Sequence, residues 1–215
     1  GIVWPTAMSS MAFLNINETL KHYFGYDSLR PGQQELIEGI LQRKDVLGIM
    51  PTGAGKSLCY QVPALMLDGI TIVVSPLISL MTDQVKALNQ AGVHAAYINS
   101  SLTDNQIRTA LFYAAQGRYK IIYVAPERLN TIRFLEFACQ VDISMVTVDE
   151  AHCISQWGQD FRPSYVGIAD FLAQLPKRPV VSAFTATATE RVKQDIMKSL
   201  RLQNPVTVVT GFDRP

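Results

Sequence analysis

The sequence has few cysteines and no excess charge of either sign, and each shortage excludes a class of protein. Its three cysteines are Cys59, Cys139 and Cys153. An odd number without a C-x-x-C pair argues against a disulfide framework and against a four-cysteine zinc site. Nineteen Lys and Arg against 18 Asp and Glu give a net charge of +1, so the field of the whole protein does not indicate a polyanionic partner. Any such partner has to be held by a local patch.

Long apolar runs are also missing. No stretch reaches the roughly 18 apolar residues of a membrane span, so no membrane partner is expected. Residues 1–7 lack the charged start and apolar centre of a secretory signal, and we interpret them as a remnant before Met8 that takes no part in the fold. Together with the unpaired cysteines, these features predict a cytoplasmic protein.

Apolar β-rich runs alternate with helix-like segments along the 215 residues. Five runs end in polar or turn-forming residues and predict strands at 45–50, 70–75, 120–125, 144–148 and 180–184. Helix-like patterns lie between them, at about 57–67, 78–91, 103–116, 130–140, 164–174 and 189–200. Continuously apolar runs are typical of parallel strands covered on both faces. The alternation therefore predicts an α/β fold, a parallel β-sheet flanked by helices.

Two more helix-like patterns, at about 16–24 and 31–42, precede the first strand. We expect residues 8–43 to form an N-terminal helical extension and residues 44–215 to form one domain. In a parallel sheet, ligands bind at the carboxyl ends of the strands, and the five polar loops fall at these ends.

The stretch MPTGAGKSLCYQ, residues 50–61, comes close to a phosphate-binding loop. The usual pattern is Gly, four residues, then Gly-Lys-Ser/Thr, and Met50 replaces the leading glycine. Phosphate contacts come from backbone N–H groups after Pro51, so Met50 can be the last strand residue. The residues expected to hold ATP phosphates are Thr52, Gly53, Ala54, Gly55, Lys56 and Ser57. A Gly-rich turn followed by a chance lysine is the alternative.

Two adjacent acids, Asp149 and Glu150, close an apolar strand in VTVDEAH. Burial alone would not place them there, whereas a bound Mg²⁺ ion explains both. Asp149 and Ser57 would ligate the metal or its water shell, and Glu150 would deprotonate the water that attacks the γ-phosphate. Lys56, Asp149 and Glu150 are therefore the candidate catalytic residues. Acids that cap neighbouring helix N-termini are the alternative.

MPTGAGKS followed by DEAH resembles superfamily 2 helicases, and the other loops resemble the RecQ family of DNA helicases. The matching segments are FGYDSLRPGQ (24–33), MPTGAGKSLCYQ (50–61), SPLISLMTDQ (75–84), APERL (125–129), DEAHCISQWGQDFRPSY (149–165) and FTATAT (184–189). They follow the family's order over most of the chain, and the likeness is to the first motor domain of a bacterial RecQ. The resemblance implies a RecA-like P-loop fold, ATP and Mg²⁺ as cofactors, and ATP-driven 3′ to 5′ unwinding of DNA.

The segment YDSLRPGQ has a physical interpretation beside the resemblance. The Gln33 amide offers one donor and one acceptor, which suits the N6/N7 edge of adenine. By resemblance, Tyr26 stacks on the base and Arg30 helps to frame it. A Pro-Gly turn with Gln33 as a solvated residue of the first helical turn is the alternative.

The segment CISQWGQDFRPSY interleaves aromatic side chains with polar ones, a combination that suits the bases and phosphates of a single strand. In RecQ proteins it senses single-stranded DNA and couples it to ATP hydrolysis. The residues implied here for DNA binding and coupling are Gln156, Trp157, Gln159, Phe161 and Arg162, with His152 of DEAH. In the loops SPLISL and APERL, the hydroxyls of Ser75 and Ser79, the helix N-termini and Arg128 are candidate contacts to DNA phosphates. A hydrophobic clasp on the DEAH loop is the alternative for Phe161 and Tyr165.

Three of these residues have specific expectations. Gln159 stands where the family usually has histidine, which puts charge-dependent coupling in doubt. His152 would bridge toward residues 185–187 when ATP is bound, or else be a satisfied structural histidine. Arg128 would contact a DNA phosphate, or else form a surface salt bridge.

The chain ends at GFDRP, a phrase that in RecQ proteins leads into a second motor domain. That domain, absent from these 215 residues, would supply an arginine to the ATP site and is an expected partner. Single-stranded DNA and duplex with a 3′ single-stranded tail are the expected substrates, in a bacterial cytoplasm at the nucleoid. A nucleotide-dependent DNA-binding module and a small-molecule kinase are the competing functions; the kinase would leave DEAHCISQWG unexplained.

Overall fold

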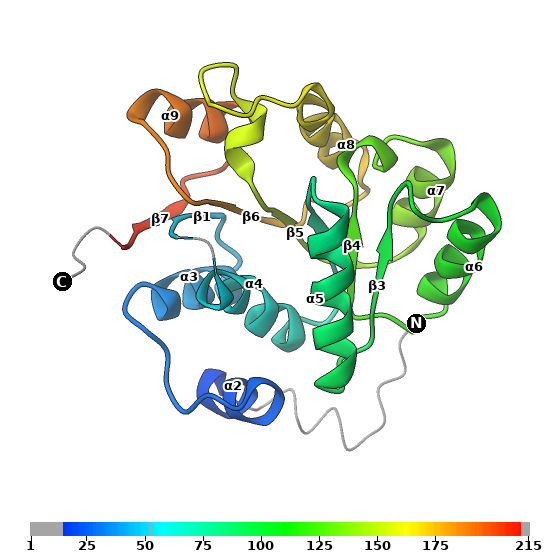
Figure 1. Ribbon diagram of the computed structural model, residues 1–215, viewed down its shortest axis with the longest axis horizontal. Helices are drawn as coiled ribbons and strands as arrows, with labels where there is room; N and C mark the ends of the chain where they lie inside the picture. Colours follow the sequence, from blue (N-terminus) through cyan, green and yellow to red (C-terminus); the bar gives the residue numbers. More distant parts are fainter. Residues whose placement is uncertain (1–14, 52, 212–215) are drawn as a thin grey trace.

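A computed structural model describes residues 15–51 and 53–211 of the chain (Figure 1). The predictions made for residues 1–7, for the start of the N-terminal extension and for Thr52 lie outside the described residues. Within the described ranges strands and helices alternate, so the predicted α/β class is confirmed. No helix there is long and apolar enough to cross a membrane.

Seven strands of the described residues form one sheet, in the order β3-β4-β2-β5-β6-β1-β7. They are β1 (Val46–Ile49), β2 (Ile70–Val74), β3 (Ala95–Ile98), β4 (Ile121–Val124), β5 (Ile143–Val148), β6 (Val180–Thr185) and β7 (Val206–Val209). All pairings are parallel. The carboxyl ends of the strands therefore meet at one edge, and this edge receives the predicted phosphate loop and DEAH segment.

The five predicted strands are the five inner strands of this sheet, while β3 and β7 were not predicted. Both missed strands lie at the edges. Two of the four residues of β3 are only half-buried, and in β7 only Val208 is buried. A strand covered on one side only does not need a continuous apolar run, so its sequence gives a weaker signal.

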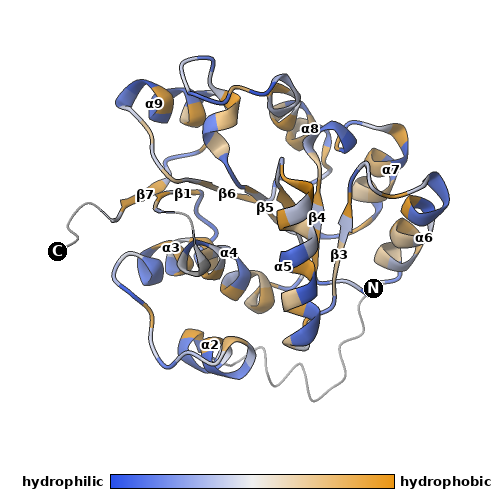
Figure 2. Ribbon diagram, in the orientation of Figure 1, coloured by the Kyte–Doolittle hydropathy of each residue, from blue (hydrophilic) through white to orange (hydrophobic). Residues whose placement is uncertain are grey.

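The helices pack on both faces of the sheet (Figure 1). They are α2 (Ile16–Phe24), α3 (Gln33–Leu41), α4 (Ala54–Met66), α5 (Ile78–Gln90), α6 (Asp104–Ala115), α7 (Ile132–Gln140), α8 (Ile168–Gln174) and α9 (Glu190–Ser199). Short 3₁₀ turns occur at η1 (Pro126–Arg128), η2 (Ala151–Ile154) and η3 (Pro163–Gly167). Figure 2 shows hydrophobic and hydrophilic residues on the same helices, as expected for helices between a buried sheet and solvent.

Each face of the sheet has its own hydrophobic core. One core joins the strands to α6, α7, α8 and α9, and the other joins them to α3, α4 and α5. A third, smaller cluster of Leu20, Ile37, Leu58 and Val62 packs α2 against α3 and α4. The helices predicted for the N-terminal extension are thus confirmed and lie against the helix that follows the phosphate loop.

Asp45 stabilises the sheet at the amino ends of its strands, opposite the predicted site. Its buried carboxylate accepts hydrogen bonds from Arg178 (2.7 and 3.0 Å), from the Val181 N–H (3.0 Å) and from the Gln203 N–H (2.7 Å). These donors precede or begin β6 and β7, the two neighbours of β1. A buried charge with this many partners is satisfied, so Asp45 holds β1 in place at the end away from the site.

Candidate functional site

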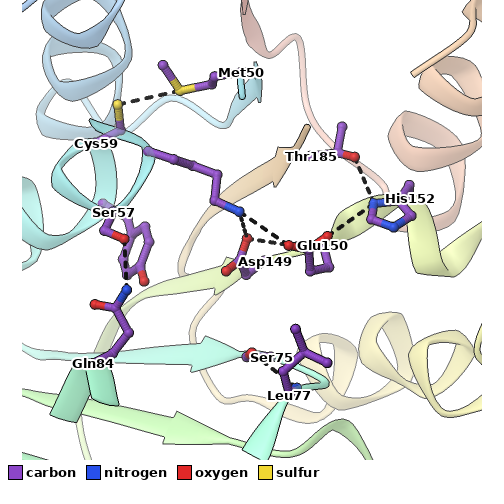
Figure 3. A network of polar contacts seen from close by, with 12 residues as sticks. Met50, Ser57, Cys59, Ser75, Leu77, Gln84, Asp149, Glu150, His152 and Thr185 are labelled. Carbon is purple, nitrogen blue, oxygen red and sulfur yellow. Dashed lines mark hydrogen bonds and ion pairs between the residues drawn. The ribbon is translucent and has the colours of Figure 1, made fainter. Parts of the chain in front are cut away.

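Lys56 lies in the first turn of α4 with its side chain only 4% exposed. Its ammonium donates to Asp149 Oδ1 at 2.7 Å and to Glu150 Oε1 at 3.4 Å (Figure 3). Burial lowers the pKa of Lys56, but the charges and hydrogen bonds of Asp149 and then Glu150 more than offset it, so the pKa lies above its ordinary value. The lysine of the loop and the two acids of the DEAH segment therefore form one charged cluster.

The backbone turn after β5 aims both acids at the lysine. Glu150 adopts a left-handed conformation, with φ 52° and ψ 44°, which costs energy for a residue other than glycine. The Glu150 N–H donates to Asp149 Oδ1 at 2.9 Å. The Tyr165 hydroxyl donates to the Asp149 carbonyl at 2.8 Å, and Tyr165 has no exposed surface. For Tyr165, the structure therefore shows the clasp on the DEAH loop.

Two glycines, Gly53 directly before α4 and Gly55 in its first turn, shape the phosphate loop in different ways. Gly53 has φ 148°, a conformation that side-chain-bearing residues rarely adopt, and α4 begins directly after it. The helix thus starts three residues earlier than the sequence predicted. A Cβ at Gly55 would lie 2.9 Å from Gln33 Nε2. The Gly53 conformation and the position of Gly55 let the loop amides and the helix N-terminus face a phosphate.

Gln33 is buried beside this loop. Its amide donates to the Gly55 carbonyl at 2.9 Å and accepts from the Arg30 N–H at 2.7 Å. With 4% of its surface exposed, Gln33 is not the solvated residue of the alternative interpretation. An amide has a second hydrogen and a second lone pair, so adenine recognition stays a prediction for Gln33.

Ser57 belongs to a chain of hydrogen-bonded polar side chains, buried except for the half-buried Gln84, that the sequence did not predict. Its hydroxyl accepts from Gln84 Nε2 at 3.1 Å, and Gln84 Oε1 accepts from Gln61 Nε2 at 2.9 Å. Gln61 also donates to the Tyr123 hydroxyl at 2.9 Å. Gln84 lies in SPLISLMTDQ, so the resemblance contained it without indicating its contact. This chain fixes the side chain expected to ligate Mg²⁺.

A cavity of about 420 Å³ opens beside Ser57. Tyr23, Tyr26, Gln61 and Gln84 are among its lining residues. Its volume is within the range of small-molecule sites, and it joins Tyr26 of the predicted base site to Ser57 of the phosphate loop. Arg30 is exposed, and neither Arg30 nor Gln33 lines this cavity.

The residues present fit Mg²⁺ and ATP. The Ser57 hydroxyl and the Asp149 carboxylate are hard oxygen donors of the kind that Mg²⁺ binds. Lys56 and the N-terminus of α4 supply positive charge for phosphates. Lys56 already bonds to two carboxylates, so a γ-phosphate would replace or share these partners.

His152 connects the DEAH turn to the end of β6. Its Nδ1 lies 2.8 Å from Thr185 Oγ1 and 3.6 Å from Glu150 Oε2 (Figure 3). The structure thus shows a contact of His152 with Thr185, while the bridge expected when ATP is bound stays a prediction.

The aromatic segment lies partly in solvent. Trp157 is 60% exposed, Gln156 and Gln159 are exposed, and Phe161 and Arg162 are half-buried. Arg162 pairs with Asp160 Oδ2 at 3.3 Å. The Trp157 ring also meets the Arg191 guanidinium of α9, a contact that sequence reasoning missed because Arg191 lies outside every matched segment.

The residues expected at DNA phosphates differ in access. Ser79 is exposed in the first turn of α5, whereas Ser75 is buried and its hydroxyl accepts from the Leu77 N–H at 3.5 Å. Arg128 is half-buried, and its Nε has no hydrogen-bond partner within the described residues. Ser79 therefore has exposed surface for a phosphate and Arg128 has some, although its Nε is buried, whereas the buried Ser75 hydroxyl is used within the turn.

Comparisons with known proteins agree with this geometry. The model of the DEAD/DEAH box helicase family matches residues 30–196. The ATP-dependent DNA helicase RecQ of Bacillus subtilis (strain 168) is 53% identical over 196 residues, which are 91% of this chain and 33% of the relative. RecQ of Haemophilus influenzae is 44% identical over 211 residues, 98% of this chain and 32% of the relative. The chain thus spans about a third of the length of these relatives.

Solved structures give the fold. A hypothetical ATP-dependent RNA helicase from Sulfolobus tokodaii superposes with a TM-score of 0.63 at 22% identity, covering 95% of this chain and 55% of that chain. The Hef helicase domain of Pyrococcus furiosus superposes with a TM-score of 0.62 at 18% identity, covering 84% and 37%. At such identities the likeness shows the fold alone, and it confirms the predicted RecA-like domain.

Proposed function

Because the chain belongs to the DEAD/DEAH box helicases, as the first RecA-like domain of the RecQ family, we propose that it is the ATP-binding half of a DNA-unwinding motor. The observation that carries this proposal is the buried cluster of Lys56, Asp149 and Glu150 at the carboxyl ends of the strands. Such a cluster joins a phosphate-gripping lysine to a metal-binding acid and a base.

The roles follow from position and charge. Lys56 binds the β- and γ-phosphates, the amides from Gly53 to Ser57 hold the phosphate chain, and Tyr26, Arg30 and Gln33 hold the adenine. Ser57 and Asp149 hold Mg²⁺, which when bound neutralises charge on the phosphates. The oxygen of the attacking water bonds to the γ-phosphorus as the bond to the ADP oxygen breaks, and Glu150 accepts a proton from this water. A kinase would require an acceptor site in place of this water.

Coupling to DNA is assigned to the aromatic segment. Trp157 stacks on a base of single-stranded DNA, Ser79 and Arg128 bind backbone phosphates, and His152 transmits the state of the nucleotide site. We further propose 3′ to 5′ polarity, a second motor domain in the full-length protein and a cytoplasmic location at the nucleoid. The relatives in Bacillus subtilis and Pasteurella multocida are ATP-dependent DNA helicases, which supports DNA as the substrate.

Strand displacement tests the function directly. A protein extended beyond Pro215 by a second motor domain should displace a labelled strand from a duplex with a 3′ tail, only with Mg·ATP, and far more slowly from a duplex with a 5′ tail. The extended Glu150→Gln variant should bind the same duplex without displacing the strand. Nucleotide-dependent binding with no displacement by the unchanged protein would favour the alternative, a DNA-binding module.

A further inference from the structure

One face of helix α9 holds the aromatic segment at two points. The guanidinium carbon of Arg191 lies 3.4 Å from the centroid of a Trp157 ring. Four residues later, Asp195 Oδ2 accepts a 2.7 Å hydrogen bond from the Ser155 hydroxyl. The same hydroxyl oxygen accepts from the Trp157 N–H at 3.2 Å. Because residues i and i+4 share a helix face, Arg191 and Asp195 together hold the short run from Ser155 to Trp157.

The contact with Arg191 leaves much of Trp157 available. The side chain stays 60% exposed with the guanidinium stacked on its ring. A cation on one face of an indole fixes the plane of the ring and leaves the opposite face for a second planar group. When a base stacks on a ring that is already held in place, the tryptophan side chain loses less entropy than when the ring rotates freely beforehand.

Helix α9, which carries Arg191, is packed firmly against the sheet. Val192 and Ile196 on α9 are buried in the core that joins the helix to the sheet. The helix also follows β6, whose last residue, Thr185, lies 2.8 Å from His152 of the DEAH turn. Along the chain, the contact of Thr185 with the DEAH turn is thus followed by helix α9, which makes the contact with Trp157.

We infer that Arg191 and Asp195 are positioning residues for single-stranded DNA. They hold the Trp157 ring so that its open face meets an unpaired base, and they thereby set the DNA concentration at which ATP hydrolysis is stimulated. This inference rests on the proposed function, since it requires Trp157 to meet DNA. Neither residue contacts Lys56, Asp149 or Glu150 in the described part of the chain.

DNA-dependent ATP hydrolysis by the extended protein, with an oligothymidylate as the probe, tests this inference. Arg191→Ala should raise the DNA concentration for half-maximal stimulation about two- to five-fold, the value of an exposed cation–π contact. Asp195→Ala should raise it as well, with the KM for ATP unchanged in both variants. Arg191→Lys keeps a cation and Asp195→Asn keeps an acceptor, so both should lie closer to the unchanged protein.

Arg118→Ala is the matched control. Arg118 makes the same kind of contact, 4.4 Å from the centroid of the Tyr113 ring, but neither residue belongs to the site. The DNA concentration for half-maximal stimulation of ATP hydrolysis should be the same in Arg118→Ala as in the unchanged protein. An unchanged value for Arg191→Ala would overturn the inference, and so would a lower value, which would mean that Arg191 obstructs the base.

A DNA-free measurement separates this inference from the proposed function. Trp4 and Trp157 are the two tryptophans of the 215 residues, so this measurement uses the 215-residue chain without the extension, in which Trp4→Phe leaves Trp157 as the only tryptophan. Time-resolved anisotropy should show a more mobile indole in Arg191→Ala and Asp195→Ala but not in Arg118→Ala. Unchanged mobility in the first two would overturn the positioning role even if DNA stimulates hydrolysis. The opposite outcome is a more mobile indole in these two variants together with an extended protein whose ATP hydrolysis DNA does not stimulate. It would overturn the proposed function and, with it, the DNA role of α9.

Discussion

Among single residues, Lys56 and Glu150 share an ion pair of 3.4 Å but have different tasks. In the proposed mechanism, Lys56 binds charge that is present before the reaction, whereas Glu150 acts on the attacking water. In the extended protein, Lys56→Ala should weaken Mg·ATP binding. Glu150→Gln should leave binding nearly intact and lower kcat by about 10²–10⁴, the usual effect of losing a general base.

Binding by calorimetry and single-turnover hydrolysis measure the two effects separately. Because Lys56→Ala leaves two acids without their partner, its thermal unfolding should be measured alongside. Equal losses of binding in the two folded variants would contradict the assigned roles.

Gln33 combines a structural contact with a predicted recognition role. Gln33→Ala removes its bond to the Gly55 carbonyl, which should weaken ATP and GTP binding alike. Loss of adenine recognition should in addition reduce the preference for ATP over GTP, by up to the roughly 1–3 kcal/mol of a bidentate amide contact. Competition binding with both nucleotides measures this ratio, and an unchanged ratio would leave Gln33 with the structural contact alone.

Trp157 is expected to couple DNA to hydrolysis without touching ATP. In the extended protein, Trp157→Ala should lower the DNA-stimulated rate of ATP hydrolysis far more than the rate without DNA. Gln159→His, which introduces a group that can carry a proton, should raise stimulation if charge matters at that position. If Trp157→Ala lowers both rates in proportion, or if the variant unfolds, the segment is a structural clasp and not a DNA sensor.

The sequence indicated which residues form the site better than it indicated the contacts between them. Lys56, Asp149 and Glu150 were predicted from type and spacing, and the structure brings them together. Gln84 and Arg191 were missed, because a glutamine or an arginine on a helix is equally compatible with a solvated face. Only their neighbours in the structure, Ser57 for Gln84 and Trp157 for Arg191, distinguish these two residues from ordinary surface residues of a helix.

At the scale of elements, Lys120 holds the loop between α4 and β2 at the start of β4. Its buried ammonium donates to the carbonyls of Leu67 and Gly69. Burial lowers the pKa of Lys120 to about 8 from 10.5, although Asp68 and Asp142 act in the opposite direction. Between these two values the unfolded chain binds more protons than the folded one, so this group makes the free energy of unfolding rise with pH.

Urea unfolding of Lys120→Met and of the unchanged chain, on both sides of pH 8, checks this sign. The stability of the unchanged chain relative to Lys120→Met should increase as the pH rises above 8. The variant loses two hydrogen bonds at every pH, so only the slope of the difference is informative. A flat difference between the two proteins across this pH range would contradict the lowered pKa of Lys120.

The inner elements were predictable and the outer ones were not. Strands covered on both faces require continuous apolar residues, which is why β2, β4 and β5 are evident from the sequence. The edge strands β3 and β7 lack that requirement. The start of α4 depends on the backbone conformation of Gly53. The spacing of apolar side chains gives no information on a backbone angle, so it could not predict this start.

At the scale of the whole molecule, we propose that the ATP site is one half of a larger arrangement. The chain spans about a third of the length of its curated relatives, and by resemblance a second motor domain supplies an arginine to the nucleotide. Such an arginine is worth about 10³–10⁵ in the rate of phosphoryl transfer. Translocation also requires two bodies that close and open on one strand. We therefore expect the 215 residues alone to bind Mg·ATP weakly and to turn it over very slowly.

Steady-state ATP hydrolysis, with and without single-stranded DNA, is the most direct measurement of this half-motor function. The 215-residue chain should show negligible turnover under both conditions. The protein extended by a second motor domain should hydrolyse ATP, respond to DNA and lose both properties in Lys56→Ala. Strong DNA-stimulated hydrolysis by the 215 residues alone, abolished by Lys56→Ala, would contradict the half-motor, and so would an extended protein that DNA does not stimulate.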